Sequence, residues 1–239
     1  SHSGTRRRLT ILGTPLTNEN VSLKLIELFL LKNEKELIKV VDNIKKIPKK
    51  EIKKLNDFQP LLDFWYYTKL SGYKDEYKPS ESLIKKFISE EKIENINNPV
   101  DAVYMYVYIR TLVECDYEKY KHLKKYFDFL ESISSKNYIV YGYYLTHVIL
   151  YNTKFGKIKN SSISSIEALE KLNDLCENKL KFERKEIDLI AEIILCCNLL
   201  NNTEFPHYSK LMLLINQTND CLNLHEQTVL TVVNKQNNF

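Results

Sequence analysis

The chain has 239 residues, of which 44% are hydrophobic and 28% are charged, as in an ordinary globular protein. Its 35 basic and 31 acidic residues leave a net charge of +4, which is too small to favour nucleic-acid binding. Only 5 glycines and 6 prolines are present, and this scarcity argues against a β protein rich in hairpins. The composition therefore leaves a helical globular protein as the leading expectation.

The cysteines indicate a reducing compartment. Their number is odd and no CxxC pair occurs, so we expect reduced thiols in a cytoplasmic protein. No apolar stretch reaches the roughly 18 residues that a membrane helix requires, so no membrane association is expected. The five cysteines are Cys115, Cys176, Cys196, Cys197 and Cys221.

The N-terminus is expected to lie outside the folded part. Ser1 to Gly4 looks like a remnant of a cloning vector, and residues 1–16 are predicted to form a flexible terminus. Residues 17–239 are predicted to form a single helical domain, with a subdivision near 92–99 as the alternative. A lysine cluster in residues 45–54 lacks the interleaved aromatic residues of a single-stranded nucleic-acid site, so we interpret it as a solvated helix face.

Apolar residues recur at helical spacing almost throughout the chain. Pro60 and Pro99 are expected in first helical turns, where the missing N–H costs nothing, and Gly72 is expected to end a helix. Trp65 and its neighbouring tyrosines are at helical spacing and are expected in the core. Three predicted helices are given by their starts, near residue 21, at Pro48 and at Pro99. The others are predicted at about 34–46, 60–72, 80–90, 116–134, 137–153, 163–180, 184–201, 206–217 and 222–234.

The predicted fold is all-α, with about eleven helices packed as antiparallel pairs because most connections are short. An α/α toroid, a solenoid-like bundle and a compact irregular bundle all remain open. No repeat period is clear enough to predict a tetratricopeptide-like array.

One predicted helix carries a histidine among apolar neighbours. Residues 139–151 are apolar or aromatic on nearly every side, so this helix is expected to be buried. His147 lies in its middle, beside Thr146, and an inward imidazole needs a partner for each ring nitrogen. It is either a satisfied core histidine, bonded to a tyrosine hydroxyl, or a functional group.

A second apolar helix carries two acids. Asp188 and Glu192 are four residues apart and share one face of the helix predicted at 184–201. Two neighbouring carboxylates repel each other unless a cation, a proton or strong donors compensate. Arg184, four residues before Asp188, is one candidate partner, and Arg110 is another that would make a buried ion pair.

His225, at the start of the last predicted helix, completes a set of two imidazoles and two carboxylates. Alone it is more typical of a surface histidine. Together with His147, Asp188 and Glu192 it has the ligand chemistry of a mononuclear Zn, Fe or Mn site. The four residues are dispersed and do not form a HExxH motif.

These residues also carry a family resemblance. The segments are Leu145-Thr146-His147, Phe155-Gly156, Asp188-Leu-Ile-Ala-Glu192, and His225 followed by Thr228 and Val229 or Leu230. With them, residues 135–235 resemble an uncharacterised family of bacterial helical proteins, a domain of unknown function. The resemblance implies no activity. It implies only that these polar residues belong together.

Two main functions compete. The first is an enzyme in which His147, Asp188, Glu192 and His225 act as metal ligands or acid and base groups, in a pocket lined by Arg110 and by tyrosines. The tyrosines are Tyr141, Tyr143, Tyr144 and Tyr151. The second is a helical scaffold that binds a peptide or partner protein, with the polar set as a packing network. A third is a subunit that presents a peptide to a separate enzyme.

Overall fold

The computed structural model describes most of the chain from residue 52 onward and a few positions before it. The described residues are 10–11, 14–15, 27, 30, 35–36, 39–40, 52–53, 55–159, 162–202, 204–218 and 222–237. Most residues of the helices expected near 21, at 34–46 and from Pro48 lie outside the described part, although the described positions 27, 30, 35–36 and 39–40 are helical. Most of the lysine cluster, Cys221 and most of the N-terminal sixteen residues also lie outside it.

The described chain is all-α apart from one short antiparallel pair, β1 (Thr10–Ile11) with β2 (Thr14–Pro15), which aligns Thr10 with Pro15. The helices are α3 (Leu55–Leu70), α4 (Glu81–Phe87), α5 (Glu90–Glu94), α6 (Pro99–Cys115), α7 (Tyr117–Tyr120), α8 (Phe127–Ser134), α9 (Tyr138–Asn152), α10 (Ile163–Asn178), α11 (Ile187–Leu199), α12 (Tyr208–Gln217) and α13 (Leu224–Asn237). Short 3₁₀ helices are η1 (Asp75–Tyr77), η2 (Lys121–Tyr126) and η3 (Arg184–Glu186).

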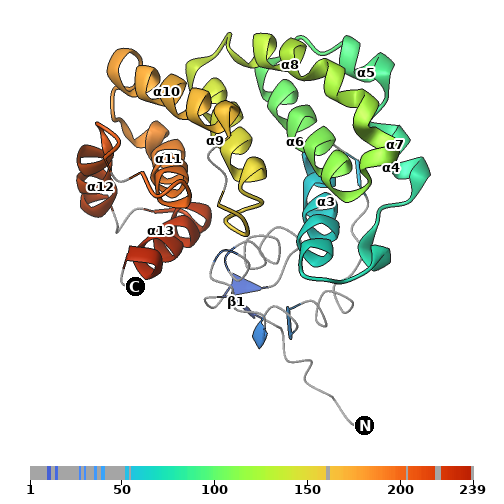
Figure 1. Ribbon diagram of the computed structural model, residues 1–239, viewed down its shortest axis with the longest axis horizontal. Coiled ribbons are helices and arrows are strands. Elements are labelled where there is room, and N and C mark those ends of the chain that lie inside the picture. Colours follow the sequence, from blue (N-terminus) through green and yellow to red (C-terminus); the bar gives the residue numbers. More distant parts are fainter. Residues whose placement is uncertain are drawn as a thin grey trace.

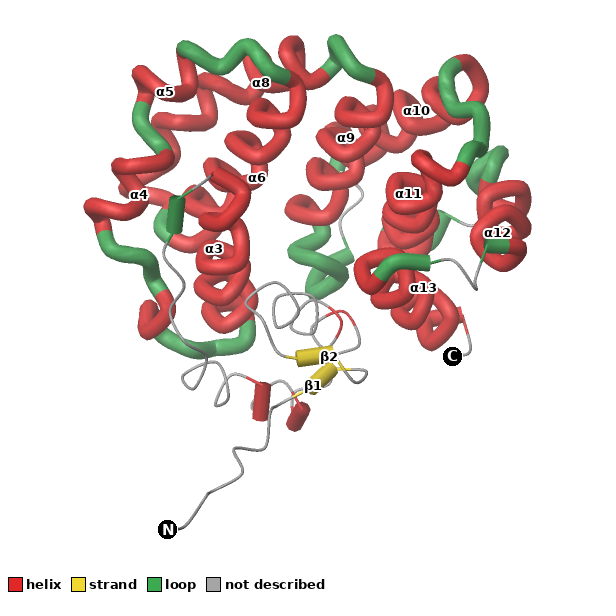
Figure 2. Tube along the Cα trace, turned by 180° about the vertical axis from the view of Figure 1, so that it is seen from behind, coloured by secondary structure: helices red, strands yellow, loops and turns green. Residues whose placement is uncertain are grey.

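The helices follow one another in an arc, from α3 to α8 at one end to α11, α12 and α13 at the other (Figure 1). Neighbours along this row pack together: α3 with α6, α6 with α9, α9 with α11, and α11 with α13. The view from behind shows the same order (Figure 2). Over the described residues, the helices therefore form a series in which each packs against its neighbours.

The expected count of about eleven helices is slightly too high for the described part. Nine of its helices have seven residues or more, while α5 and α7 have only five and four. None of the described helices is long and apolar enough to cross a membrane.

Several helix boundaries follow the local chemistry of the sequence. Asn98 caps α6 by accepting hydrogen bonds from the N–H groups of Val100 and Asp101, and Pro99 occupies the first turn. Gly72 adopts a φ of +91° just after α3, a conformation that glycine reaches without strain. The prediction that α3 starts at Pro60 is wrong, because the helix begins at Leu55 and contains the proline. Phe58 and Leu62 are buried on either side of Pro60, and their packing compensates for the hydrogen bond that the proline cannot donate.

The single helix predicted at 116–134 is wrong as well. The chain there forms α7, the 3₁₀ helix η2 and then α8. Tyr120, Leu123 and Tyr126 are all buried and lie three residues apart. This spacing matches the three residues per turn of a 3₁₀ helix, so the tighter winding keeps all three side chains in the core.

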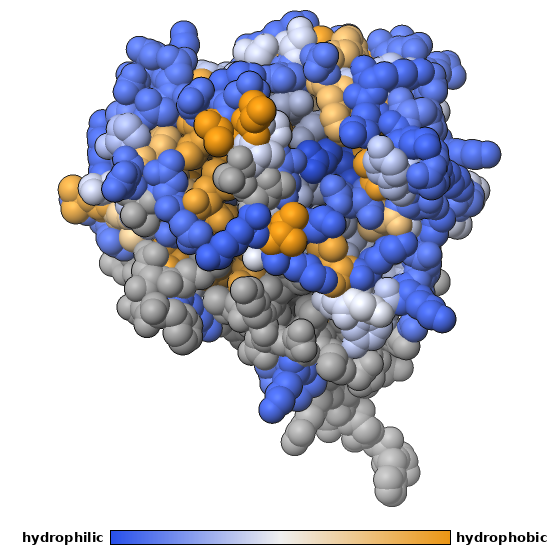
Figure 3. Space-filling model, in the orientation of Figure 1, coloured by the Kyte–Doolittle hydropathy of each residue, from blue (hydrophilic) through white to orange (hydrophobic). Residues whose placement is uncertain are grey.

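The core is rich in aromatic residues, as the sequence predicted for Trp65, which is fully buried. Tyr66, Tyr151 and Phe155 pack with ring centroids 5.3 to 5.8 Å apart. The surface seen in Figure 3 is mainly hydrophilic, with small hydrophobic areas between the charged residues. The aromatic core thus holds the central helices together.

Gly142 allows α9 and α11 to approach closely. A Cβ at this position would lie 2.5 Å from one δ carbon of Leu189, and Leu189 is itself fully buried on α11. Any larger residue at 142 therefore has to displace a packed side chain.

We expect Gly142→Ala to destabilise the protein by about 1–2 kcal/mol in urea unfolding, because overpacking outweighs the higher helix propensity of alanine. The added substitution Leu189→Val should recover part of this loss by making room. Purely additive effects of the two changes would contradict the close approach.

Candidate functional site

The candidate site lies where α9, α11 and α13 meet, and each helix contributes a polar side chain. Asp188 is in the first turn of α11, with Glu192 one turn later. His225 is in the first turn of α13, and His147 is in the second half of α9. Because α11 packs against both α9 and α13, its carboxylate face lies between the two histidines.

His225 and Asp188 make the shortest contact of the site. The Nδ1 of His225 lies 2.5 Å from the Oδ1 of Asp188, and its Nε2 lies 3.5 Å from the Oε1 of Glu192. One imidazole therefore faces both carboxylates. Asp188 receives a further hydrogen bond of 2.7 Å from the hydroxyl of Tyr143.

Glu192 is the most buried of these acids, with 7% of its side chain exposed. The fully buried hydroxyl of Thr146 donates to its Oε2 at 2.6 Å. The Nδ1 of His147 lies 4.0 Å from the same oxygen. Both residues stand one turn apart from Tyr143 on α9, so a single face of that helix meets the acids.

His147 makes a hydrogen bond that determines which ring nitrogen carries the proton. Its Nδ1 lies 2.7 Å from the backbone carbonyl oxygen of Tyr143. A carbonyl only accepts, so Nδ1 is the donor and Nε2 keeps the lone pair of the neutral ring. The expectation of a tyrosine hydroxyl partner is wrong, because a tyrosine carbonyl one helical turn earlier takes that place.

The charges of the site shift two pKa values in opposite directions. Burial disfavours the imidazolium of His225, but its hydrogen bond to Asp188 and the charges of Glu192, Asp188 and Glu226 prevail and raise its pKa to about 9. Burial likewise disfavours ionised Asp188, yet the hydrogen bonds from His225 and Tyr143 keep its pKa below the usual value. Without an added ion, a protonated His225 offsets the charge of one of the two carboxylates.

We expect this pairing to appear in the pH dependence of stability. Because the pKa of His225 is raised, its contribution is complete below its unfolded value of about 6.5 and is lost as the pH rises through about 9. Urea unfolding of chelator-treated protein should therefore show falling stability over this interval. A His225→Gln variant should show a flatter profile, and equal profiles would contradict the pairing.

A capping box and an arginine hold the start of α13. The backbone N–H of Glu226 donates to Asn223 Oδ1 at 2.8 Å, and that of Asn223 donates to Glu226 Oε2 at 3.0 Å. Arg184 donates to both oxygens of Glu226, at 2.8 and 3.1 Å. The pairing expected between Arg184 and Asp188 is therefore wrong, since a buried carboxylate on another helix binds the guanidinium in a fork.

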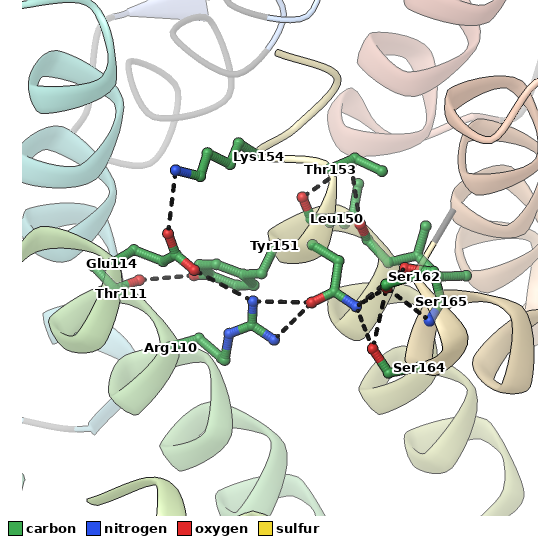
Figure 4. A network of polar contacts seen from close by, with 12 residues as sticks. Arg110, Thr111, Glu114, Leu150, Tyr151, Thr153, Lys154, Ser162, Ser164 and Ser165 are labelled. Carbon is green, nitrogen blue, oxygen red and sulfur yellow. Dashed lines mark hydrogen bonds and ion pairs between the residues drawn. The ribbon is translucent and has the colours of Figure 1, made fainter. Parts of the chain in front are cut away.

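Arg110 belongs to a different network (Figure 4). Its guanidinium donates to Asn152 Oδ1 from both terminal nitrogens at 3.2 Å, and to the hydroxyl of Tyr106 at 3.1 Å. Its carboxylate partner is Glu114, at 3.5 Å. Arg110 therefore forms no ion pair with Asp188 or Glu192 and does not line their site, so both expectations for this residue are wrong.

Only one of the tyrosines expected at the site reaches it. The hydroxyl of Tyr143 contacts Asp188, whereas that of Tyr151 lies 2.7 Å from Thr111 Oγ1 in the core. Tyr144 packs on Tyr106 and Tyr141 donates to Glu131. Tyr141 and Tyr144 lie on other faces of α9 than Tyr143, and Tyr151 lies two turns further along the helix.

Three residues of the site were not predicted, although the sequence contains a signal for two of them. Asn223 and Glu226 have the spacing of a capping box before an apolar run. Thr146 has no such signal in the sequence, because its bond to Glu192 depends on how α9 packs against α11.

Residues 140–217 match the model of a domain of unknown function, DUF6895. The match confirms a resemblance to an uncharacterised family over less than half of the chain. The DUF6895 segment includes the Leu-Thr-His, Phe-Gly and Asp-Leu-x-x-Glu segments and ends before His225. No curated protein and no solved structure matches the chain.

The Phe-Gly segment within the DUF6895 match, Phe155-Gly156, lies at the end of α9. Lys154, Phe155 and Gly156 have φ values of 47°, 52° and 84°, so the chain leaves α9 through a left-handed turn. Phe155 is buried against Tyr66 and Tyr67. This segment thus ends α9 and anchors it in the aromatic core, away from the acids.

Proposed function

We propose that this protein is a metal-dependent enzyme whose divalent ion is held by His225 and Glu192. The observation that carries the proposal is the convergence of Asp188, Glu192 and His225, which place one donor atom each within 4.8 Å of the others. Imidazole and carboxylate donors suit Zn, Fe and Mn. Two helices, α11 and α13, supply them.

The spacing of the two proposed ligand atoms supports this assignment. His225 Nε2 and Glu192 Oε1 lie 3.5 Å apart. Two donors that each lie about 2.1 Å from a tetrahedral ion are separated by about 3.4 Å. The pair therefore needs almost no movement to hold an ion, once Nε2 has lost its proton.

The outer partners of the ligands also support it. Histidine ligands usually donate their second ring N–H to a carboxylate or carbonyl, which orients the ring. Asp188 has this position relative to His225, and the Thr146 hydroxyl orients Glu192. We therefore assign Asp188 as the group that orients His225, and not as a ligand.

A bound ion would act as a Lewis acid and lower the pKa of a coordinated water. His147 is the residue proposed to exchange a proton there, because its Nε2 keeps the lone pair and its ring lies beside Glu192. Its side chain is 17% exposed and that of His225 is 34% exposed. A small substrate could therefore approach from solvent.

The proposal takes the protein to be cytoplasmic. The four described cysteines are buried free thiols, which fits a reducing compartment.

Metal binding is the first test. Chelator-treated protein is titrated with Zn²⁺, Mn²⁺ or, without oxygen, Fe²⁺, and one ion per chain is expected. Glu192→Gln keeps the size of the side chain but removes the anionic ligand, so it should lose stoichiometric binding. Absence of binding to the wild-type protein, or equal binding by the variant, would overturn the proposal.

Turnover is the second test. The metal-loaded protein is assayed with p-nitrophenyl esters of carboxylic and phosphoric acids, and hydrolysis that disappears with chelator is expected. His147→Gln should retain the ion and lose the hydrolysis. An ion that is bound without any turnover would indicate a structural metal centre.

The second candidate is a helical scaffold for a peptide or partner protein. It is favoured by the contacts of the metal-free site, in which a protonated His225 lies between Asp188 and Glu192 and offsets one of the two carboxylates. In that function the set orders the packing of α9, α11 and α13. Substitutions such as His225→Gln would then reduce stability without changing any metal binding.

A further inference from the structure

The contact between Arg184 and Glu226 joins the two helix starts that carry Asp188 and His225. Arg184 is in η3, directly before α11, and Asp188 follows four residues later. Glu226 is the immediate neighbour of His225 in the first turn of α13. Arg184 donates to both oxygens of Glu226. This contact therefore connects the backbone near Asp188 with the backbone next to His225.

The burial of Glu226 sets this contact apart from an ordinary helix cap. Only 2% of its side chain is exposed, against 50% for Arg184. A carboxylate in a capping box needs only the N–H of the cap residue, and Asn223 provides that here. The guanidinium adds two charge-assisted bonds in a planar fork, which fix direction as well as distance.

His225 depends on this arrangement because it lies in the first turn of its helix. First turns fray, since their N–H groups have no partner within the helix. A shift of α13 along its axis would separate the Nδ1 of His225 from Asp188, a contact of 2.5 Å. Among the described residues, the imidazole of His225 has Asp188 and Glu192 as its hydrogen-bond and ion-pair partners.

We propose that Arg184 and Glu226 are positioning residues, which hold the imidazole of His225 in register with Asp188. They contact neither of the proposed ligand atoms, Nε2 of His225 and Oε1 of Glu192. Their effect passes through the start of α13. This positioning role rests on the proposed function, in which His225 is a metal ligand, but its first test is made on metal-free protein.

The test compares two Arg→Lys variants. Arg184→Lys keeps the charge and loses the fork, whereas the control Arg110→Lys disrupts the separate network of Figure 4. The first readout is the downfield NMR signal of the His225 Nδ1 proton in metal-free protein, assigned by its loss in His225→Gln. Far-UV circular dichroism checks that each variant folds.

We expect this signal to broaden or disappear in Arg184→Lys and to persist in Arg110→Lys. The second readout is Co²⁺ affinity, which should fall about 10–100-fold in Arg184→Lys, as for the loss of an outer partner of a metal ligand. The double variant Arg184→Met with Glu226→Gln, which leaves no unpaired charge, should behave like Arg184→Lys.

An unchanged proton signal in both Arg184 variants would overturn the positioning role. If the wild-type protein fails to bind Co²⁺, the proposed function fails, and the proton signal still decides whether Arg184 positions His225. A loss of signal in Arg110→Lys equal to that in Arg184→Lys would show a general loosening of the fold and would also overturn the inference.

Discussion

Replacing His225 with alanine is expected to weaken Zn²⁺ binding by at least about 100-fold. The loss of an outer partner alone costs about 10–100-fold, and this substitution removes a proposed ligand, Nε2, that lies 3.5 Å from Glu192 Oε1. Competition with a chromophoric chelator measures the affinity. His122, an exposed histidine 3.8 Å from Glu90, provides the control variant His122→Ala, which should bind Zn²⁺ normally.

The order of effects separates ligands from orienting groups. Asp188→Asn keeps the size of the side chain and weakens its bond to His225 Nδ1, so a loss of about 10–100-fold is expected. His225→Ala should therefore lose more affinity than Asp188→Asn, and His122→Ala none. A larger loss in Asp188→Asn than in His225→Ala would assign Asp188 as the ligand.

Tyr151→Ala is expected to lower the free energy of unfolding by about 3–5 kcal/mol, the usual cost of removing a large buried aromatic side chain. Tyr151 is almost fully buried, with ring centroids 5.3 Å from Tyr66 and 5.4 Å from Phe155. Urea unfolding measures the loss. The cavity would lie in the aromatic core that anchors the end of α9.

Tyr151→Phe is the matched control for this prediction. It keeps the ring and loses the contacts of the hydroxyl with Thr111 Oγ1 at 2.7 Å and with the Val107 carbonyl oxygen at 3.3 Å, so a loss of about 1–2 kcal/mol is expected. Its Zn²⁺ affinity should equal that of the wild-type protein. A selective loss of Zn²⁺ binding in Tyr151→Phe, without a change in stability, would instead support the expectation that Tyr151 lines the site.

The helices could be predicted where local signals were strong. Asn98 and Pro99 mark the start of α6, and Gly72 follows the end of α3, because caps and left-handed turns depend on neighbouring residues. The 3₁₀ helix η2 also has a sequence signal, the spacing of three among Tyr120, Leu123 and Tyr126, which a search for a period of 3.6 does not detect.

The grouping of polar residues on single helices could also be predicted. The spacing of four between Asp188 and Glu192 places both on one face, and the same rule places His147 beside Tyr143. The same period places Tyr141 and Tyr144 on other faces, but it does not separate Tyr151, which follows His147 by four residues and yet contacts Thr111. Which neighbouring helix the face would meet does not follow from it.

Ion pairing between helices could not be read in this way. Arg184 stands four residues before Asp188, yet it binds Glu226 on α13. Arg110 lies on the apolar helix α6, yet it binds Asn152 and Glu114. In each case several acceptors were chemically equivalent, and only the packing of the helices brought one of them within reach.

Short-range spacing was enough to predict the all-α class, many helix boundaries and the buried stretches in which ionisable groups are costly, because burial pattern and capping depend on neighbouring residues. It could not predict that His225 meets Asp188 and Glu192, that Thr146 bonds Glu192, or that Arg184 bonds Glu226. These contacts span 37 to 46 residues, and they depend on the register between helices, which is set by the packing of all side chains together.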